Sequence, residues 1–510
     1  MKIPVPPADR TGRVIASVGP RQPRLAGARR DVGQTIAALA VIGFVLYVAI
    51  ALAGGGGRAL TLTYPAGCAA VAAICYLRSP SLYFGFTWWT WLLTPMIRRV
   101  FDLRYGFHAT SPLLLGPLLA TSIAIFTMVR YRRALRSGTY APFLAAFAAL
   151  LYAYLIGMIR QSFAAATYDL LVWAAPIVFG LHLALEWRRF PRIRDTLSAV
   201  AVWGMLVTGA YGIFQFVDPP MWDRVWVVSA EMYSVGIPAP FLIRVFSTVN
   251  APGPFATLLV CCFLFALVSP QRWRYIALAV GLVALLLTKG RSAWGALVLG
   301  GLVLHLRQPI RAIPRQWLAL MTILLIAGPV IMQPRVLRLV SARAGTITQL
   351  GRDASYQARV GSTRQYVARV LSDPVGAGLG LFGGATKLRT GSASGSALDS
   401  GPLEVLGSMG WIGGSLYFMA LLSILLSTLR RGGPRRDAIT DAAAGVVVAI
   451  LASSLFGNVF TGFSGFLLWN GVGILIGGRS YSFAVEMTAR YANHPGLPDR
   501  TTVVARHTAA

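Results

Sequence analysis

The sequence predicts an all-α, polytopic integral membrane protein on three observations. The mean hydropathy of the 510 residues is +0.63, and 56% of them are hydrophobic. Only 13% are charged, whereas roughly a quarter of the residues of a soluble globular protein are charged. The apolar residues form runs long enough to cross about 30 Å of hydrocarbon as helices. The +30 net charge lies mostly in short gaps between these runs, so membrane topology explains it and no nucleic-acid partner is expected.

Residues 1–34 are predicted to be a flexible basic tail in the cytoplasm, with seven positive and two negative side chains. The pair Arg29-Arg30 lacks the apolar and small-residue context of an export signal, so no cleavable signal is expected. The four cysteines all fall inside apolar runs and are expected to be reduced core residues. They are Cys68, Cys75, Cys261 and Cys262.

About fourteen apolar runs follow this tail, some of them marginal in length. They lie near 35–54, 59–77, 81–97, 111–129, 140–159, 164–184, 196–217, 253–269, 274–288, 291–306, 316–332, 402–428, 442–460 and 463–478. The first eleven occupy 35–332 and the last three 401–478. Between these groups lies a large polar loop, 333–400, and the chain ends in a tail, 479–510.

A cytoplasmic N-terminus determines on which side of the membrane each gap between runs lies. If each gap is numbered by the run before it, every even-numbered gap is then cytoplasmic. Each of these gaps contains arginine, as the positive-inside rule requires. The arginines are Arg78; Arg130, Arg132, Arg133 and Arg136; Arg188, Arg189, Arg192 and Arg194; Arg272 and Arg274; Arg307, Arg311 and Arg315; Arg430, Arg431, Arg435 and Arg436. The weakest run, 81–97, is retained because without it the basic N-terminal tail would lie outside. Both termini are therefore expected in the cytoplasm, and the segments 218–252 and 333–400 in the periplasm.

Several cations lie on the predicted outer side, where topology gives no reason for them. They are Arg98, Arg99, Arg104, Arg160, Arg244, Lys289 and Arg291, together with nine basic residues against three acidic ones in 335–400. A single arginine at a helix end is commonly a snorkelling anchor, and that alternative stands for each one. As a set they suit phosphate, because the planar arginine fork matches its oxygens. Since no nucleotide pool exists outside the cytoplasm, a phosphate-bearing donor there is expected to be lipid-linked.

Carboxylates on that side are few. Asp169 lies about one turn into its run, and Asp399 and Glu404 flank the start of the run after the large loop. Either of the latter two is a candidate general base for an attacking hydroxyl. The alternatives are a helix N-cap for Asp399 and a helix-dipole partner for Glu404. Gly401-Pro402 predicts that the helix begins after Asp399.

The glycine-rich stretch from Gly376 to Gly384, GAGLGLFGG, resembles a dinucleotide fingerprint only superficially. It has no strand–helix context, so a Rossmann site is rejected. A flexible loop or a nest of backbone amides for a phosphate remains open. No HExxH or CxxC pattern occurs in the sequence, so the chemistry is expected to need neither metal nor cofactor.

Four stretches resemble the Wzy-type O-antigen polymerase and O-antigen ligase superfamily of polytopic glycosyltransferases. They are RVFSTVNAPGPFATLL from Arg244, LLLTKGRSAWGAL from Leu285, STRQYVARVLSDPVGAGLGLFGG from Ser362 and DSGPLEVLGSMGWIGG from Asp399. One departure is informative: the His-Asn pair of the family appears here as Asp399-Ser400. The histidine associated with ligases is therefore missing, which favours a polymerase.

The resemblance implies a GT-C-like fold in the bacterial inner membrane and transfer of an undecaprenyl-diphosphate-linked oligosaccharide at the periplasmic face. It also implies that Arg291, Arg244 and Arg364 hold the diphosphate, with Lys289 and Arg160 as further candidates among the outer cations. The expected product is an exopolysaccharide, capsule or O-antigen, and the expected partners include a chain-length regulator and a flippase of the same pathway.

Two alternatives stay open. A ligase would transfer finished glycan to lipid A-core or another acceptor with the same leaving group. A transporter of an anion or lipid-linked sugar belongs to another class, and its ionisable residues would lie near mid-membrane.

Overall fold

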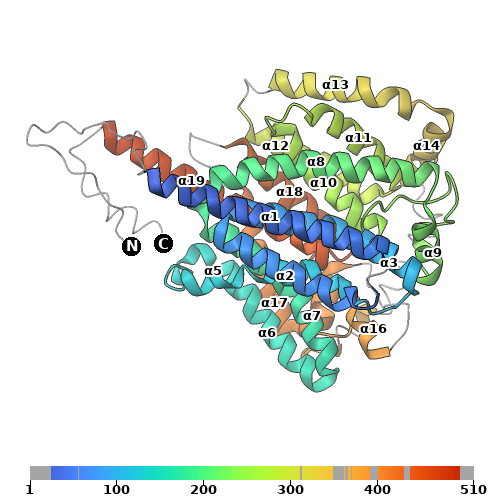
Figure 1. Cartoon of the computed structure of the whole chain (residues 1–510), viewed down its shortest axis with the longest axis horizontal. Helices are drawn as coiled ribbons and strands as arrows, with labels where there is room; N and C mark the ends of the chain where they lie inside the picture. Colours follow the sequence, from blue (N-terminus) through green and yellow to red (C-terminus); the bar gives the residue numbers. More distant parts are fainter. Residues whose placement is uncertain are drawn as a thin grey trace, which may run out of the picture.

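The computed structural model describes residues 24–54, 57–309, 313–348, 361, 366–368, 370, 372–390, 400–429 and 437–493. The regular structure in these residues is helical, and none of them is in a strand. Long helices run in roughly the same direction across the molecule, with α1 and α2 side by side along one face (Figure 1). The all-α prediction is therefore confirmed for the described part of the chain.

The helices follow one another without long interruptions in the first half of the chain. Their bounds are α1 Arg24–Gly54, α2 Leu60–Arg78, α3 Pro80–Tyr105, α4 Leu115–Ser122, α5 Ile125–Arg130, α6 Ala141–Arg160, α7 Phe163–Leu185, α8 Phe190–Val217, α9 Met221–Ser229, α10 Pro252–Val268, α11 Arg274–Leu287, α12 Arg291–Arg307, α13 Ile313–Ile331, α14 Pro334–Thr348, α16 Ala385–Thr390, α17 Gly401–Leu429, α18 Ala438–Ser453 and α19 Gly462–Asn493.

Every one of the fourteen predicted runs falls on helical structure. Eight helices of the described chain are long and apolar enough to cross a membrane: Val32–Gly54, Leu60–Arg78, Pro112–Arg130, Gly138–Arg160, Phe163–Leu185, Trp187–Val217, Gly401–Leu429 and Ala438–Phe456. Three more runs coincide with shorter apolar helices, Pro252–Val268, Arg274–Leu287 and Met321–Ile331. The remaining runs lie within α3, α12 and α19. The chain thus has the composition and helix lengths of a polytopic membrane protein, and the count of fourteen crossings stays a prediction.

Helix extends into parts of both predicted tails, 1–34 and 479–510. Helix α1 begins at Arg24 rather than near residue 35, directly after Pro23. Helix α19 continues to Asn493, past residue 478, and ends shortly before Pro495. Proline disfavours helix in the residue that precedes it and cannot continue a helix from its own nitrogen. In the sequence, each of these two described helix ends therefore lies close to a proline.

Two predicted helices are interrupted. Run 111–129 divides into α4 and α5, where the hydroxyls of Thr121 and Ser122 donate to the carbonyls of Pro117 and Leu118. Such back-bonding commonly bends a helix. Helix α17 is broken at Gly410, which has φ 63° and ψ −163°.

Helices α7 and α19 pack with their backbones almost in contact. A Cβ added to Gly180 would lie 2.4 Å from Trp469 O, and one added to Gly473 would lie 2.3 Å from Gly180 O. Small residues allow this close approach, which is typical of helix pairs in membranes. The pair forms the centre of the core, with Trp173 and Trp469 fully buried beside it.

Gaps that were predicted on the same side of the membrane meet at the same end of the bundle. At one end Arg104 Nη1 donates to Leu52 O and Ala53 O, and Arg99 Nη2 donates to Ser247 O. At the opposite end Arg307 Nε lies 3.0 Å from Asp441 Oδ1. We call the first end, which holds residues 97–111, 218–252 and 372–390, the loop end; it includes α9 and α16 on the right of Figure 1.

Candidate functional site

The C-terminal part of α3 carries two consecutive arginines that contact different parts of the loop end. Arg98 Nε lies 3.1 Å from Asp102 Oδ2, and its Nη2 donates to His108 O at 2.6 Å. Burial raises the pKa of the Asp102 carboxyl to about 6, although the Arg98 charge opposes this rise. Neighbouring side chains on a helix point about 100° apart, so Arg99 points toward other elements.

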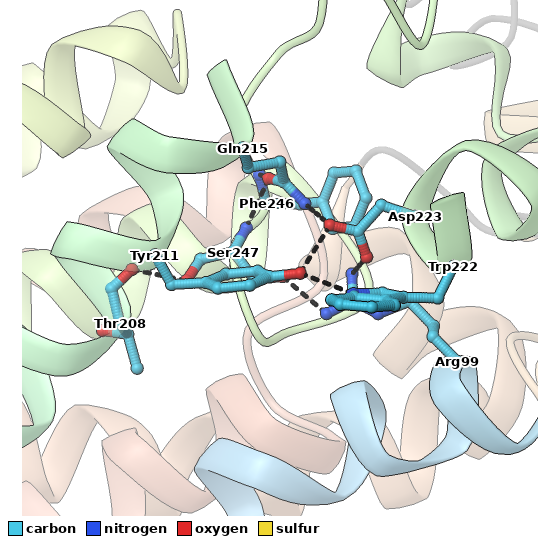
Figure 2. Close-up of polar contacts among 8 residues, drawn as sticks. All are labelled: Arg99, Thr208, Tyr211, Gln215, Trp222, Asp223, Phe246 and Ser247. Atoms are coloured by element: carbon cyan, nitrogen blue, oxygen red, sulfur yellow. Dashed lines mark hydrogen bonds and ion pairs between the residues drawn. The ribbon is translucent and has the colours of Figure 1, made fainter. Parts of the chain in front are cut away.

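Arg99 belongs to a largely buried polar cluster that joins α3, α8 and α9 (Figure 2). Its Nη1 is 3.2 Å from Asp223 Oδ1, and neither side chain is exposed to solvent. Asp223 Oδ2 accepts hydrogen bonds from Tyr211 Oη at 2.8 Å and from Gln215 Nε2 at 2.5 Å. Burial raises the pKa of Asp223, and the charge of Arg99 opposes this. The snorkelling alternative is therefore wrong for Arg99, whose guanidinium points into the protein.

Arg244, Lys289 and Arg291 gather at one turn of the loop end, which we call the cationic turn. Arg244 Nε donates to Thr288 O at 3.2 Å, and its Nη1 donates to Ser234 O at 2.9 Å. Lys289 follows Thr288 with φ 55°, and Arg291 is the first residue of α12. Each of the three cations makes at least one further contact. Two stretches that are distant in the sequence therefore contribute to one basic site.

The glycine loop, Gly376–Gly384, packs tightly between α6, α7 and α17. Four successive amides are already engaged: Ala377 N donates to Gly407 O, Gly378 N to Ser408 O, Leu379 N to Ala153 O and Gly380 N to Asp169 Oδ2, at 2.8 to 3.0 Å. A Cβ on Gly378, which has φ +81°, would lie 2.2 Å from Gly157 N. The amide-nest interpretation is wrong for these four amides, since they bind groups of the protein itself.

Two buried carboxyl groups, Asp169 on α7 and Glu404 on α17, form what we call the carboxylate pair. They are 7% and 5% exposed and lie close enough to interact electrostatically. Asp169 Oδ2 accepts the Gly380 amide at 2.8 Å, and Glu404 Oε1 accepts Asn458 Nδ2 at 2.6 Å. Neither forms an ion pair with a residue that the structure describes. A buried carboxyl group without a counter-ion is costly, so it usually has a function.

Arg98 interacts electrostatically with Tyr168, the residue before Asp169, and with Lys387. The side chain of Tyr168 is within electrostatic range of both Asp169 and Arg98, and a Cβ on Gly384 would lie 3.4 Å from Tyr168 Oη. Partial burial and, to a smaller extent, the Arg98 charge lower the pKa of Lys387. The Lys387 ammonium forms no hydrogen bond or ion pair within the described chain.

The other predicted site residues have different positions. Arg160 lies beside the glycine loop, where its Nη1 contacts Asp373 Oδ2 at 2.6 Å and Gly376 O at 2.8 Å. Asp399 and Arg364 lie outside the described residues. Helix α17 begins at Gly401, as the sequence predicted, and Glu404 is in its first turn.

Sequence reasoning gave no site role to Asp169, Asn458 or Asp223. Asp169 carried a signal, because it is an acidic residue inside an apolar run. Asn458 carried none, because its role depends on the fold that brings it to Glu404. In the described part of the chain, no group of three or more His, Cys, Asp and Glu side chains is arranged to hold a metal.

The loop end thus has two chemically different groups, and consecutive arginines of α3 contact a residue close in sequence to each of them. The cationic turn suits an anion, whereas the carboxylate pair suits acceptance of a proton. Arg98 interacts electrostatically with Tyr168, the residue before Asp169, and Arg99 binds Ser247, three residues from Arg244. No protein-family model matches this chain, and no curated protein matches it.

Proposed function

We propose that the protein is a polysaccharide polymerase that joins undecaprenyl-diphosphate-linked repeat units at the periplasmic face of the bacterial inner membrane. The observation that carries the proposal is the cationic turn. Arg244 donates to the carbonyl of Thr288, which places it beside Lys289 and Arg291. Arginine forks bind phosphate oxygens in pairs, and such bonds are strong where water is partly excluded. The resemblance of the same two stretches to Wzy-type polymerases and O-antigen ligases supports a diphosphate as the ligand.

In the proposed reaction a hydroxyl of the acceptor glycan attacks the anomeric carbon of the donor glycan. The bond from that carbon to the diphosphate oxygen breaks, and prenyl diphosphate leaves with the electron pair. The hydroxyl proton passes to Glu404, whose carboxyl is held by Asn458. Asp399, five residues earlier, stays the alternative base. The cations stabilise the charge that develops on the leaving oxygen, a contribution that is often the largest in catalysis.

The proposal includes the finer topology: fourteen crossings, a GT-C-like arrangement and both termini in the cytoplasm. Its support is that gaps assigned to one side by the positive-inside rule contact one another at one end of the bundle. The loop end would then face the periplasm, where lipid-linked repeat units are available.

The test uses the full-length protein in liposomes with the lipid-linked repeat unit of its host. A ladder of lipid-attached glycans with release of prenyl diphosphate is the expected result. A single transfer only after lipid A-core or a protein acceptor is added would replace the polymerase by a ligase. Absence of prenyl diphosphate release under both conditions would overturn the proposal in favour of a transporter.

Substitutions at the cationic turn sharpen this test. Arg291→Ala should abolish the ladder at unchanged protein level, and Arg291→Lys should restore little activity because the planar fork is lost. Arg104→Ala is the matched control, since Arg104 is a loop-end cation that binds the carbonyls of Leu52 and Ala53. Full activity of Arg291→Ala would contradict the assigned role.

A further inference from the structure

Backbone strain in the described chain is concentrated around the cationic turn. Four non-glycine residues there have positive φ: Glu231, Phe241, Ser247 and Lys289, with φ between 52° and 66°. Three belong to the segment 230–251, and Lys289 belongs to the turn that Arg244 contacts. Such conformations persist only where surrounding contacts enforce them, and they cluster at functional sites.

Several contacts hold Ser247 in its strained conformation. Gln215 Oε1 accepts both Phe246 N at 3.0 Å and Ser247 N at 2.9 Å, and Arg99 Nη2 donates to Ser247 O at 2.6 Å. The Ser247 hydroxyl also donates to Thr208 O (Figure 2). One side-chain amide therefore fixes two consecutive backbone amides of the segment that carries Arg244.

The orientation of Gln215 is itself determined by the buried acid. Its Nε2 donates to Asp223 Oδ2, so its Oε1 faces the loop amides. Asp223 is held in turn by Tyr211 Oη and by the charge of Arg99. The chain of contacts runs from the ion pair through Gln215 to Ser247, and from there along three residues of backbone to Arg244.

We propose that Gln215, Asp223 and Arg99 are positioning residues that set the Arg244 side chain against the turn at Thr288, so that the site is preorganised for a prenyl diphosphate. This inference rests on the proposed function and deepens it. Arg244 N donates to Val235 O at 2.8 Å and Val245 N to Leu287 O at 3.4 Å. These bonds hold the amides of Arg244 and Val245, and Gln215 holds the next two amides, Phe246 and Ser247. Release of the latter two would let the backbone after Arg244 move and the guanidinium shift against Thr288. Small displacements of a binding group reduce affinity steeply.

The experiment measures binding of geranylgeranyl diphosphate to the full chain in nanodiscs by calorimetry. Gln215→Met keeps the size of the side chain and removes the acceptor of both loop amides. We expect its Kd to rise roughly 10- to 100-fold. In the Arg244→Ala background, Gln215→Met should have no further effect on Kd, because residues that act through one another are not additive.

Asp441→Asn is the matched control, because Asp441 is an equally buried partner of an arginine at the opposite end of the bundle. It should lower thermal stability and leave Kd unchanged. If the wild-type protein does not bind the probe, the diphosphate site of the proposed function fails. If the wild type binds, Arg244→Ala weakens binding and Gln215→Met does not, the positioning role alone fails. An additive loss in the double variant would also overturn it.

Discussion

Glu404→Gln separates a proton-accepting role from a structural one, because the two roles predict different changes in turnover. The substitution keeps the Oε1 acceptor for Asn458, which lies at 2.6 Å, and removes the ionisable oxygen. A general base contributes about 10²- to 10⁴-fold to a rate, which corresponds to roughly 3 to 5 kcal/mol of barrier. Turnover of lipid-linked repeat units should fall by that factor.

The free energy of unfolding should change little. A hydrogen bond to a charged group is stronger than one to a neutral group by about 1 kcal/mol. Against this loss, the substitution would remove an ionisable group from a site that has no counter-ion in the described chain, and a buried unpaired charge costs several kcal/mol. The net change should therefore lie between a loss of about 1 kcal/mol and a gain. A helix-dipole partner would instead leave turnover intact and lose about 0.3 to 1 kcal/mol.

The assay pairs prenyl diphosphate release in liposomes with thermal unfolding of the same preparations. Glu186→Gln is the control, since Glu186 is also buried but pairs with Arg189 at 3.1 Å; it should keep full turnover. Wild-type turnover of Glu404→Gln would refute the assignment of Glu404 as the base. Equal loss of turnover in Glu186→Gln would also refute it, because the effect would then not depend on the site.

Three further predictions concern stability. Gly410→Ala should lower the free energy of unfolding by roughly 3 kcal/mol, because φ is +63° and the new Cβ would lie 2.4 Å from a backbone oxygen. The control Gly301→Ala has open space around it and should raise the free energy of unfolding by up to about 1 kcal/mol. Equal effects of the two variants in chemical denaturation would contradict this reasoning. The pKa of Asp102 is raised from 3.8 to about 6, so its contribution to stability is present below pH 4 and is lost as pH rises through 6. The free energy of unfolding of the wild type should therefore fall by roughly 3 kcal/mol over this interval, and Asp102→Asn should remove that fall. The same pH dependence of unfolding in both proteins would contradict the raised pKa. Asp223→Asn should lower the free energy of unfolding by about 3 to 5 kcal/mol, because it removes the carboxylate that pairs with the buried Arg99. Asp373→Asn, in a half-exposed pair, should lower it by about 1 kcal/mol or less. Similar shifts of the two melting temperatures would show that burial does not govern the contribution of these pairs.

The helices were predictable because apolar runs of spanning length have no alternative to helix in a membrane. Their interruptions were not. The break at Gly410 depends on residues distant in sequence: Trp411 N donates to Pro374 O at 2.8 Å, so the carbonyl of the large loop replaces a contact within α17. The start of α1 and the end of α19 could have been predicted more closely from Pro23 and Pro495, since proline limits a helix regardless of hydropathy.

The site was partly predictable for a related reason. These cations were identified because they lie in gaps predicted to be outside, where the positive-inside rule gives no reason for them, and Arg244 does lie beside the turn that holds Lys289 and Arg291. The sequence could not separate these cations from Arg99, because the partner of Arg99 is Asp223, which is far along the chain. An ion pair between distant segments has no local pattern, so it becomes visible only when the fold brings the two residues together.

The glycine loop explains how the carboxylate pair is assembled. Asp169 is on α7 and Glu404 is on α17, and the loop binds both helices: Gly380 N donates to Asp169, while Gly378 N donates to Ser408 O. The close approach requires glycine, because a Cβ on Gly376 would lie 2.3 Å from Gly410 N and one on Gly378 would meet α6. Four amides of the loop thus bind groups of the protein itself, and the loop fixes the two helices, and with them the two carboxyl groups, in one arrangement.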